Sequence, residues 1–338
     1  MKDKDVSIDR YTFAYTESFR ARSVPVVLRF AHFVRAVILS PILLIEWKAV
    51  LGQRKSRSAR AITLLNDISN STHGRGLDVM NKLICSIRNR CISDESHPFG
   101  PAVTPSGCFF GLYDLKSNVD DLRQIGFTRV NQFVDNKSAI QIGIELGSIA
   151  GESSYPAKRY SNLEEWQQDN QSGPRFTLES EQIRTHKALA SIAENSVICE
   201  IAKRYIGCAP ILVSRQVWTT RAPLDCSAEV VSDAAMAFHC DSDYFGFLKF
   251  FILLTDVGAD NGPFSFVPRS HKGRRHVAGR MRDSEIISGN DELCLGVGRA
   301  GDLIIADTKG WHKATPPKLG YRTMFQVVYS SSLFGSPT

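Results

Sequence analysis

The sequence lacks a hydrophobic run long enough to cross a membrane. In its hydrophobic N-terminal region the longest uncharged stretch is residues 36–45, which is ten residues, whereas a membrane-spanning helix needs about 20. The first ten residues mix acidic with basic side chains and lead into no adjacent apolar run, which is unlike a secretory signal. We therefore expect a cytoplasmic protein without a transmembrane span.

Closely spaced cysteine pairs are also absent. The eight cysteines are scattered, and none forms a Cys-x-x-Cys pair. A zinc ribbon needs such pairs, and a disulfide framework is typical of small secreted chains. Hydrophobic residues at 43% and charged residues at 22% are ordinary for a globular protein, which excludes wholesale disorder and collagen-like or coiled-coil architectures.

The net positive charge is confined to one end of the chain. The formal net charge is +6, but residues 1–60 carry a net charge of +7 and the remaining residues a net charge of −1. A nucleic-acid-binding protein usually carries its basic residues across the folded face. We therefore expect no nucleic-acid partner.

The basic segment also contains a predicted amphipathic helix. Between Val26 and Leu39, the residues Arg29, His32 and Arg35 fall on one narrow helical stripe, and the rest is apolar; after Pro41 the apolar surface continues to Ile45. Such a helix can lie in a membrane interface, and it can equally dock on the folded body or on a second subunit. Peripheral membrane contact through residues 26–45 is thus one of three interpretations.

The C-terminal half shows the clearest periodicity. Residues 61–175 give no pattern from which elements can be placed. From residue 176 apolar side chains recur at three- and four-residue steps as far as Tyr205, and Gly207 is expected to end the last helix. Strands are then predicted over residues 211–219, 234–241, 246–256, 264–267, 302–306 and 322–330. Short strands preceded by helices predict a mainly β, α+β fold, in which a barrel or sandwich packs against a helical layer.

The strongest local motif is His239-Cys240-Asp241. On a strand, residues two apart project to the same face, so the imidazole and the carboxylate converge. His312, which follows a predicted strand, is the leading candidate for a third ligand. Two histidines and one carboxylate on one face of an octahedral metal leave three positions open, as in non-haem Fe(II) oxygenases, where an oxo acid takes two and dioxygen the third.

Arg322 is a candidate for binding the far end of that oxo acid. It lies ten residues after His312, at the start of the next predicted strand. A guanidinium can hold a carboxylate with two parallel hydrogen bonds and keeps its charge. Alternation predicts that Arg322, Met324, Gln326 and Val328 share a face, so that Arg322 can point into a barrel while Tyr321 and Thr323 point out.

Three segments carry a resemblance to a known family. Residues 239–257, 261–272 and 301–329 resemble the corresponding segments of bacterial phytanoyl-CoA dioxygenase-like proteins in order, spacing and turn residues. The resemblance implies a double-stranded β-helix that binds Fe(II) and 2-oxoglutarate and uses O2. It further implies that His239, Asp241 and His312 are the iron ligands and that Arg322 binds the distal carboxylate. Phe251 falls where relatives place an aromatic residue beside 2-oxoglutarate, and Lys249 lies on the same strand face.

Two positions bear on the chemistry that the resemblance implies. Where some relatives have a hydroxyl two residues after the distal histidine, this chain has Ala314, and Thr315 is the neighbour that could replace it. Family halogenases replace the carboxylate ligand by a small residue; Asp241 is present here, which favours hydroxylation or another oxidation. The substrate, a small molecule or a lipid-like compound, is left open.

These observations divide the chain into two parts. Residues 1–60 are predicted to form a basic, apolar-rich extension with helical character, and residues 61–338 the oxygenase domain with helices in its N-terminal part. The leading hypothesis is an Fe(II)- and 2-oxoglutarate-dependent dioxygenase that releases succinate and CO2. The alternatives are a non-catalytic sensor that binds metal and 2-oxoglutarate, and another metal-dependent cupin-type enzyme. The polar segment 273–290 is predicted to be a loop, either a lid over the barrel or a solvated surface loop.

Overall fold

The structure is a computed structural model of the chain, and it describes residues 26–51, 60–91, 114–154, 157–223, 230, 235–272, 280–286 and 292–335. The basic run before residue 60 and most of the polar segment 273–290 lie outside these residues. No described helix is long and apolar enough to span a membrane.

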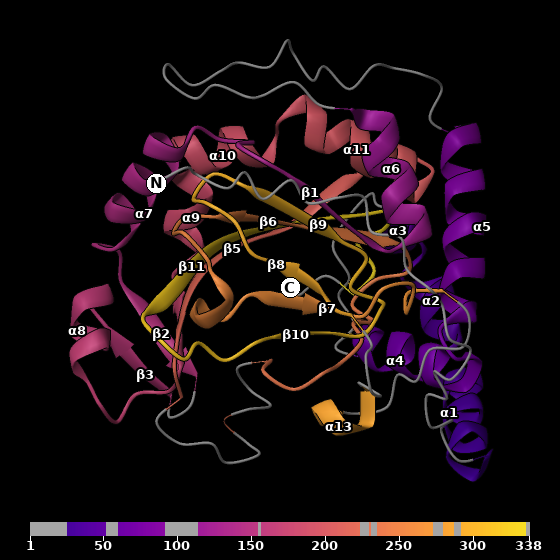
Figure 1. The fold of residues 1–338 in the computed structure, drawn as a ribbon. Coiled ribbons are helices and arrows are strands. Elements are labelled where there is room, and N and C mark those ends of the chain that lie inside the picture. The colour runs from indigo at the N-terminus through magenta and orange to yellow at the C-terminus, as the bar shows by residue number, and fades with distance from the viewer. Residues whose placement is uncertain are drawn as a thin grey trace.

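The described helices flank two sheets (Figure 1). The N-terminal helices are α1 (Val26–Leu39), α2 (Pro41–Ile45), α3 (Trp47–Val50), α4 (Ala61–Thr72) and α5 (Arg75–Cys91). The later helices are α6 (Leu115–Gln124), α7 (Asn136–Leu146), α8 (Leu163–Gln168), α9 (Ser180–Thr185), α10 (Lys187–Ala193), α11 (Ser196–Ile206), the 3-10 turn η1 (Ala259–Asn261) and α13 (Asp283–Ile286).

The strands form one large and one small antiparallel sheet. They are β1 (Phe127–Val130), β2 (Gly151–Ser154), β3 (Ala157–Tyr160), β4 (Arg175–Leu178), β5 (Ile211–Arg221), β6 (Phe247–Leu253), β7 (Phe264–Phe266), β8 (Cys294–Gly296), β9 (Leu303–Ala306), β10 (His312–Ala314) and β11 (Tyr321–Ser330). The large sheet has the order β1-β9-β6-β11-β5-β4-β2-β3, and the small sheet the order β10-β7-β8. This arrangement of two sheets and a helical layer confirms the predicted fold class.

Strand β6 shows why the sheet has two buried faces. All seven of its residues are buried, and five of them alternate between two apolar clusters. Leu248, Phe250 and Ile252 join the cluster shared with the helices, whereas Phe251 and Leu253 join the cluster between the sheets. A strand that is covered on both sides is expected to be a nearly continuous hydrophobic run, as this one is.

Helices α10 and α11 cover the outer face of the large sheet (Figure 1). The side chain of Asn195 accepts a hydrogen bond from the Val197 amide at the start of α11, and Gly207 ends the helix with a φ of 98°. Glycine adopts this left-handed conformation without steric cost. The predicted capping role of Gly207 is thus confirmed.

The predicted strand at residues 234–241 differs from the structure. Among its described residues, 235–241, only Phe238 and His239 make ladder pairs, with Met281 and His312 respectively, and both are isolated bridges. Ala235 has a φ of 56°, which a strand does not accommodate. The segment is extended at the residues that form the site, but it is not a regular strand.

Candidate metal centre and co-substrate cavity

Main-chain pairing brings the two histidines together. The His239 amide donates to the His312 carbonyl at 2.9 Å, and the His312 amide donates to the His239 carbonyl at 3.0 Å. The same pairing continues at Asp241, whose amide donates to the Thr308 carbonyl at 2.9 Å. Because His312 also belongs to β10, the small sheet fixes the position of both imidazoles.

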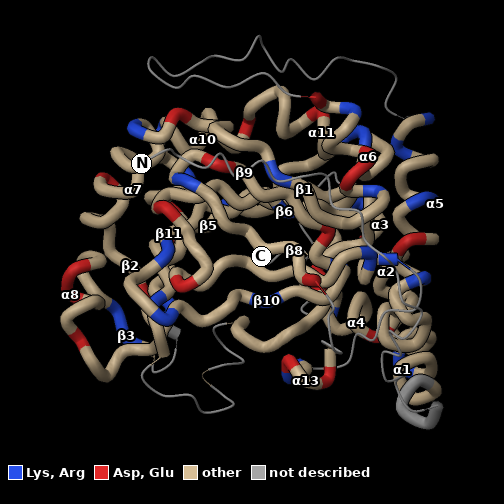
Figure 2. The backbone as a smooth tube through the Cα atoms, viewed as in Figure 1, with Lys and Arg blue, Asp and Glu red and all other residues tan. Residues whose placement is uncertain are grey.

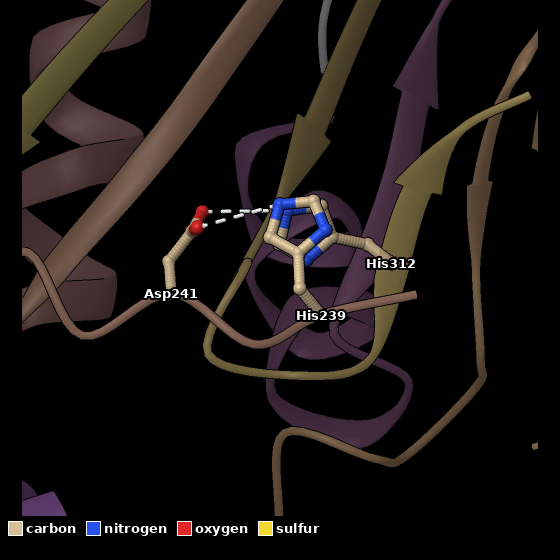
Figure 3. Close-up of side chains that lie close together, drawn as sticks. All are labelled: His239, Asp241 and His312. Atoms are coloured by element: carbon tan, nitrogen blue, oxygen red, sulfur yellow. Dashed lines mark ion pairs between the residues drawn. The ribbon is translucent and has the colours of Figure 1, made fainter. Parts of the chain in front are cut away.

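The three side chains converge as the sequence predicts (Figure 3). His239 Nε2 lies 3.7 Å from Asp241 Oδ1, and His312 Nε2 lies 3.3 Å from Asp241 Oδ2. Two donors that each lie about 2.1 Å from a common ion are at most about 4.2 Å apart, so both separations suit a shared metal ion. No other group of three potential metal-ligating side chains of this kind occurs among the described residues.

Main-chain carbonyls orient both imidazoles. His239 Nδ1 lies 2.9 Å from the Ala237 carbonyl oxygen, and His312 Nδ1 lies 2.9 Å from the Gly310 carbonyl oxygen. A carbonyl can only accept, so each Nδ1 carries a proton and the Nε2 of each ring is directed at the site. Burial, followed by the nearby His312, lowers the pKa of His239 to about 3, which keeps that ring neutral.

Lys249 lies beside the carboxylate of the triad. Its ammonium donates to Asp241 Oδ2 at 2.7 Å and to Asp243 Oδ2 at 3.0 Å. Burial opposes the charge on Lys249, but Asp241 and Asp243 outweigh it and raise its pKa above the usual value. Burial likewise opposes the charge on Asp241, yet Lys249 holds the pKa of Asp241 well below its usual range. The carboxylate is therefore ionised and available to a cation.

The triad opens into a cavity of about 220 Å³ between the two sheets. All six residues that the sequence analysis selected line it. The lining residues are Arg175, Gln216, Trp218, Ala235, His239, Asp241, Lys249, Phe251, Phe264, His312, Ala314, Arg322, Met324 and Gln326.

Arg322 is a buried cation in this cavity. Its side chain is 0% exposed and its Nη1 donates to the Gly262 carbonyl. Neither Nε nor Nη2 has a hydrogen-bond partner among the described residues. Burial, with a contribution from the charge of Arg175, lowers the pKa of Arg322 to about 9. A buried guanidinium with open donors is an anion-binding group.

Arg175 is a cavity residue that the sequence analysis missed. It is on β4, and its guanidinium lies 4.4 Å from the centre of the Trp218 ring, a cation–π contact. It falls at the edge of the region without clear periodicity, so no local pattern pointed to it. Gln216 and Trp218 were also missed, although they alternate along a correctly predicted strand, and that alternation places both on one face.

The remaining selected positions form the walls. Phe251 packs against Phe264 with ring centres 5.1 Å apart and is almost completely buried. Ala314 lines the cavity, but the Thr315 hydroxyl lies 2.6 Å from the Ser265 hydroxyl, with which it forms a hydrogen bond. Thr315 is not among the lining residues, so it does not replace a hydroxyl at Ala314.

A family model supports the resemblance found in the sequence. The model described as phytanoyl-CoA dioxygenase (PhyH) matches residues 122–318, more than half of the chain. The matched range contains the triad, Lys249 and Phe251, and it ends before Arg322. No curated protein matches the chain.

Several solved structures are similar in part. The epimerase SnoN from nogalamycin biosynthesis, described as non-heme and alpha ketoglutarate dependent, is 18% identical with a TM-score of 0.45, over 64% of this chain and 82% of its own. EvdO2 from Micromonospora carbonacea var. aurantiaca is 13% identical with a TM-score of 0.46, over 66% and 93%. HygX from Streptomyces hygroscopicus, with nickel, 2-oxoglutarate and hygromycin B bound, is 13% identical with a TM-score of 0.44, over 64% and 86%.

Proposed function

The chain belongs to the phytanoyl-CoA dioxygenase family, and on this basis we propose that it is an Fe(II)- and 2-oxoglutarate-dependent dioxygenase. It hydroxylates an unactivated C–H bond of a small-molecule or lipid-like substrate. The observation that carries the proposal is that His239, Asp241 and His312 share one buried cavity with Arg322.

The triad is proposed to hold the ferrous ion. Two imidazoles and one ionised carboxylate form the donor set expected for non-haem iron with open coordination positions. The main-chain carbonyls of Ala237 and Gly310 orient the imidazoles through Nδ1. When bound, the ion and 2-oxoglutarate supply the oxidising chemistry: O2, 2-oxoglutarate and the substrate C–H give the alcohol, succinate and CO2.

Arg322 is proposed to bind the distal carboxylate of 2-oxoglutarate. Its open Nε and Nη2 donors point to a missing anionic partner, because a buried cation without one is costly. Arg175 adds a second positive charge to the same cavity. A dicarboxylate that spans the triad and Arg322 would therefore find a cation at each end.

The apolar walls are proposed to keep water from the reacting groups. Trp218, Phe251 and Phe264 pack against one another around the cavity, and exclusion of water protects a reactive oxidant from side reactions. Lys249 fixes the Asp241 carboxylate through its hydrogen bond. Since Asp241 occupies the position that family halogenases leave open for halide, hydroxylation is the favoured outcome.

Anaerobic titration with Fe(II) and 2-oxoglutarate tests the proposal. We expect a visible charge-transfer band with the parent chain, no band with His239→Ala, and a band with His186→Asn, a histidine substitution far from the cavity. With Arg322→Gln we expect metal to bind as in the parent but 2-oxoglutarate to bind at least about 10-fold more weakly, since a charged hydrogen bond is lost.

The remaining hypotheses predict different results. A sensor would show the band but form no succinate with any substrate pool under O2. Another metal-dependent enzyme would not need Arg322, so undiminished activity of Arg322→Gln would support it. Equal metal binding by the parent and His239→Ala would refute the proposed centre. The expectations of a cytoplasmic location and of no nucleic-acid partner stay predictions.

A further inference from the structure

Helices α1 to α3 present an apolar face to the solvent. We use this name for eight exposed hydrophobic side chains, each between 39% and 78% exposed. They are Phe30, Phe33, Val34, Val37, Ile38, Leu44, Ile45 and Trp47. The α1 members recur at three- and four-residue steps, so they form one stripe, and those of α2 continue it. An isolated exposed hydrophobic residue is ordinary, but a contiguous set of this size marks an interaction surface.

Two described polar side chains of α1, His32 and Arg35, pair with the folded body instead. His32 Nδ1 lies 2.8 Å from Asp67 Oδ1, and Arg35 donates from Nε and Nη2 to both Asp67 oxygens at 2.6 Å. Asp67 is on α4 and is 0% exposed. Because this buried pairing fixes how α1 is rotated, the apolar face is the side that the folded protein presents outward. The sequence shows both stripes of α1 but leaves open which of them faces the solvent.

The charge around the face distinguishes its two main candidate partners, lipid and a second copy of the chain. The only acidic residue of α1 to α3 is Glu46, which is 3% exposed, and Figure 2 shows no acidic segment along α1. Among the described side chains of these helices, Arg35 is 55% exposed although it pairs with Asp67, and Lys48 is exposed beside the Trp47 ring. Residues 1–60 carry a net charge of +7. A second copy would bring like charges together, whereas an anionic membrane surface complements them.

From this arrangement we propose that the apolar face docks on an anionic phospholipid bilayer. The aromatic and aliphatic side chains enter the interface without spanning it, and the flanking basic residues meet the lipid headgroups. Trp47 and Lys48 at the end of the face are the residue pair that favours the boundary between apolar chains and water. The proposal stands on this surface alone and does not depend on the chemistry of the cavity.

Flotation with lipid vesicles tests the proposal on the full chain. We expect binding to vesicles that mix phosphatidylglycerol with phosphatidylcholine, weaker binding to phosphatidylcholine alone, and further weakening at high salt. Ile38→Glu should weaken binding by about 10-fold or more, because an inserted aliphatic side chain is lost. The matched control is Ile144→Glu on α7, which makes the same charge change at a residue of similar exposure, 65% against 68%.

Four results would overturn the proposal. One is failure of the parent chain to float with anionic vesicles. Another is equal loss of binding in Ile38→Glu and Ile144→Glu, since charge alone would then explain it. The third is a parent dimer in sedimentation velocity that Ile38→Glu converts to a monomer without any vesicle binding, which would assign the face to a second copy. Circular dichroism should show that Ile38→Glu melts as the parent does; a lower melting temperature would mean that the chain itself covers the face.

Discussion

At the scale of single residues, the site depends on groups that no ligand motif includes. The imidazoles of His239 and His312 are oriented by main-chain carbonyls, and Asp241 is balanced by Lys249. These contacts set the protonation and direction of each donor atom before any metal binds.

The Lys249→Met substitution tests whether the Lys249 ammonium balances the charge of the Asp241 carboxylate. Removing the ammonium leaves Asp241 a nearly buried carboxylate without its main counter-charge, and we expect the metal-free chain to lose about 3 kcal/mol of unfolding free energy. A divalent ion restores the missing positive charge, so metal should stabilise the variant more than the parent. Urea unfolding with and without Mn(II) measures both effects.

A surface lysine provides the control for this substitution. Lys158 Nζ lies 2.6 Å from Asp169 Oδ2, nearly the same distance as the 2.7 Å between Lys249 Nζ and Asp241 Oδ2. The Lys158 side chain, however, is 55% exposed. Lys158→Met should therefore change stability by less than about 1 kcal/mol, with no dependence on metal. Equal effects of the two substitutions would mean that the Lys249–Asp241 ion pair contributes no more than a surface ion pair.

At the scale of elements, the turn before β7 positions Arg322. Gly262 has a φ of 73° and its carbonyl accepts the hydrogen bond from Arg322. A Cβ at this position would lie 2.4 Å from the Thr315 carbonyl oxygen, so the turn would have to move. We expect Gly262→Ala to lower stability by about 1 to 3 kcal/mol and also to weaken 2-oxoglutarate binding.

A substitution at Gly320 distinguishes the effect of backbone strain from the effect of moving the turn. It has a similar φ of 65°, but its nearest neighbour would lie 3.6 Å from an added Cβ. Gly320→Ala should lower the free energy of unfolding by about 1 kcal/mol, which is the cost of placing alanine in the left-handed conformation. It should leave 2-oxoglutarate binding unchanged in calorimetric titration. If both alanine variants bind 2-oxoglutarate as the parent does, Gly262 does not position Arg322.

The pairing of α1 with α4 is the second element-scale feature open to test. Asp67→Asn removes the charge that pairs with His32 and Arg35. We expect the free energy of unfolding to fall by about 2 to 3 kcal/mol and proteolysis within residues 26–39 to become faster. Asp120→Asn is the control, because its partner Arg123 lies 3.9 Å away at the surface and such pairs contribute little. Unchanged protease sensitivity in Asp67→Asn would show that apolar packing alone holds α1.

At the scale of the whole molecule, the triad links distant segments. His239 and Asp241 precede β6 of the large sheet, whereas His312 belongs to β10 of the small sheet. An ion bound by all three cross-links the segment before β6 to the segment around β10, so it should stabilise the domain that contains both. The stabilisation grows with ligand concentration and is about 2.7 kcal/mol at 100 times the dissociation constant.

Thermal unfolding under anaerobic conditions measures this linkage. Adding Fe(II) should raise the melting temperature of the parent chain by several degrees, and a chelator should reverse the rise. His312→Ala should show no rise with the same ion. A rise of the same size in His312→Ala would place the stabilising metal elsewhere.

Local spacing in the chain was enough to predict several elements and most of the site. Period-two alternation indicated the strands that carry Phe251 and Arg322, and the helical period indicated α11 with its terminal Gly207. The His-x-Asp spacing and the resemblance of residues 239–329 to one family selected the donor set. These signals are readable because each depends on residues that are close in the chain.

The features that depend on distant neighbours emerged only from the folded chain. The main-chain pairing of His239 with His312, the second cation Arg175 and the partner of Lys249 arise where remote segments pack together. The rotation of α1 is the clearest case: its stripes are visible in the sequence, but Asp67 on α4 determines which one faces solvent. A buried carboxylate must be neutralised where it lies, and its position is fixed by packing, which the local pattern of α1 does not contain.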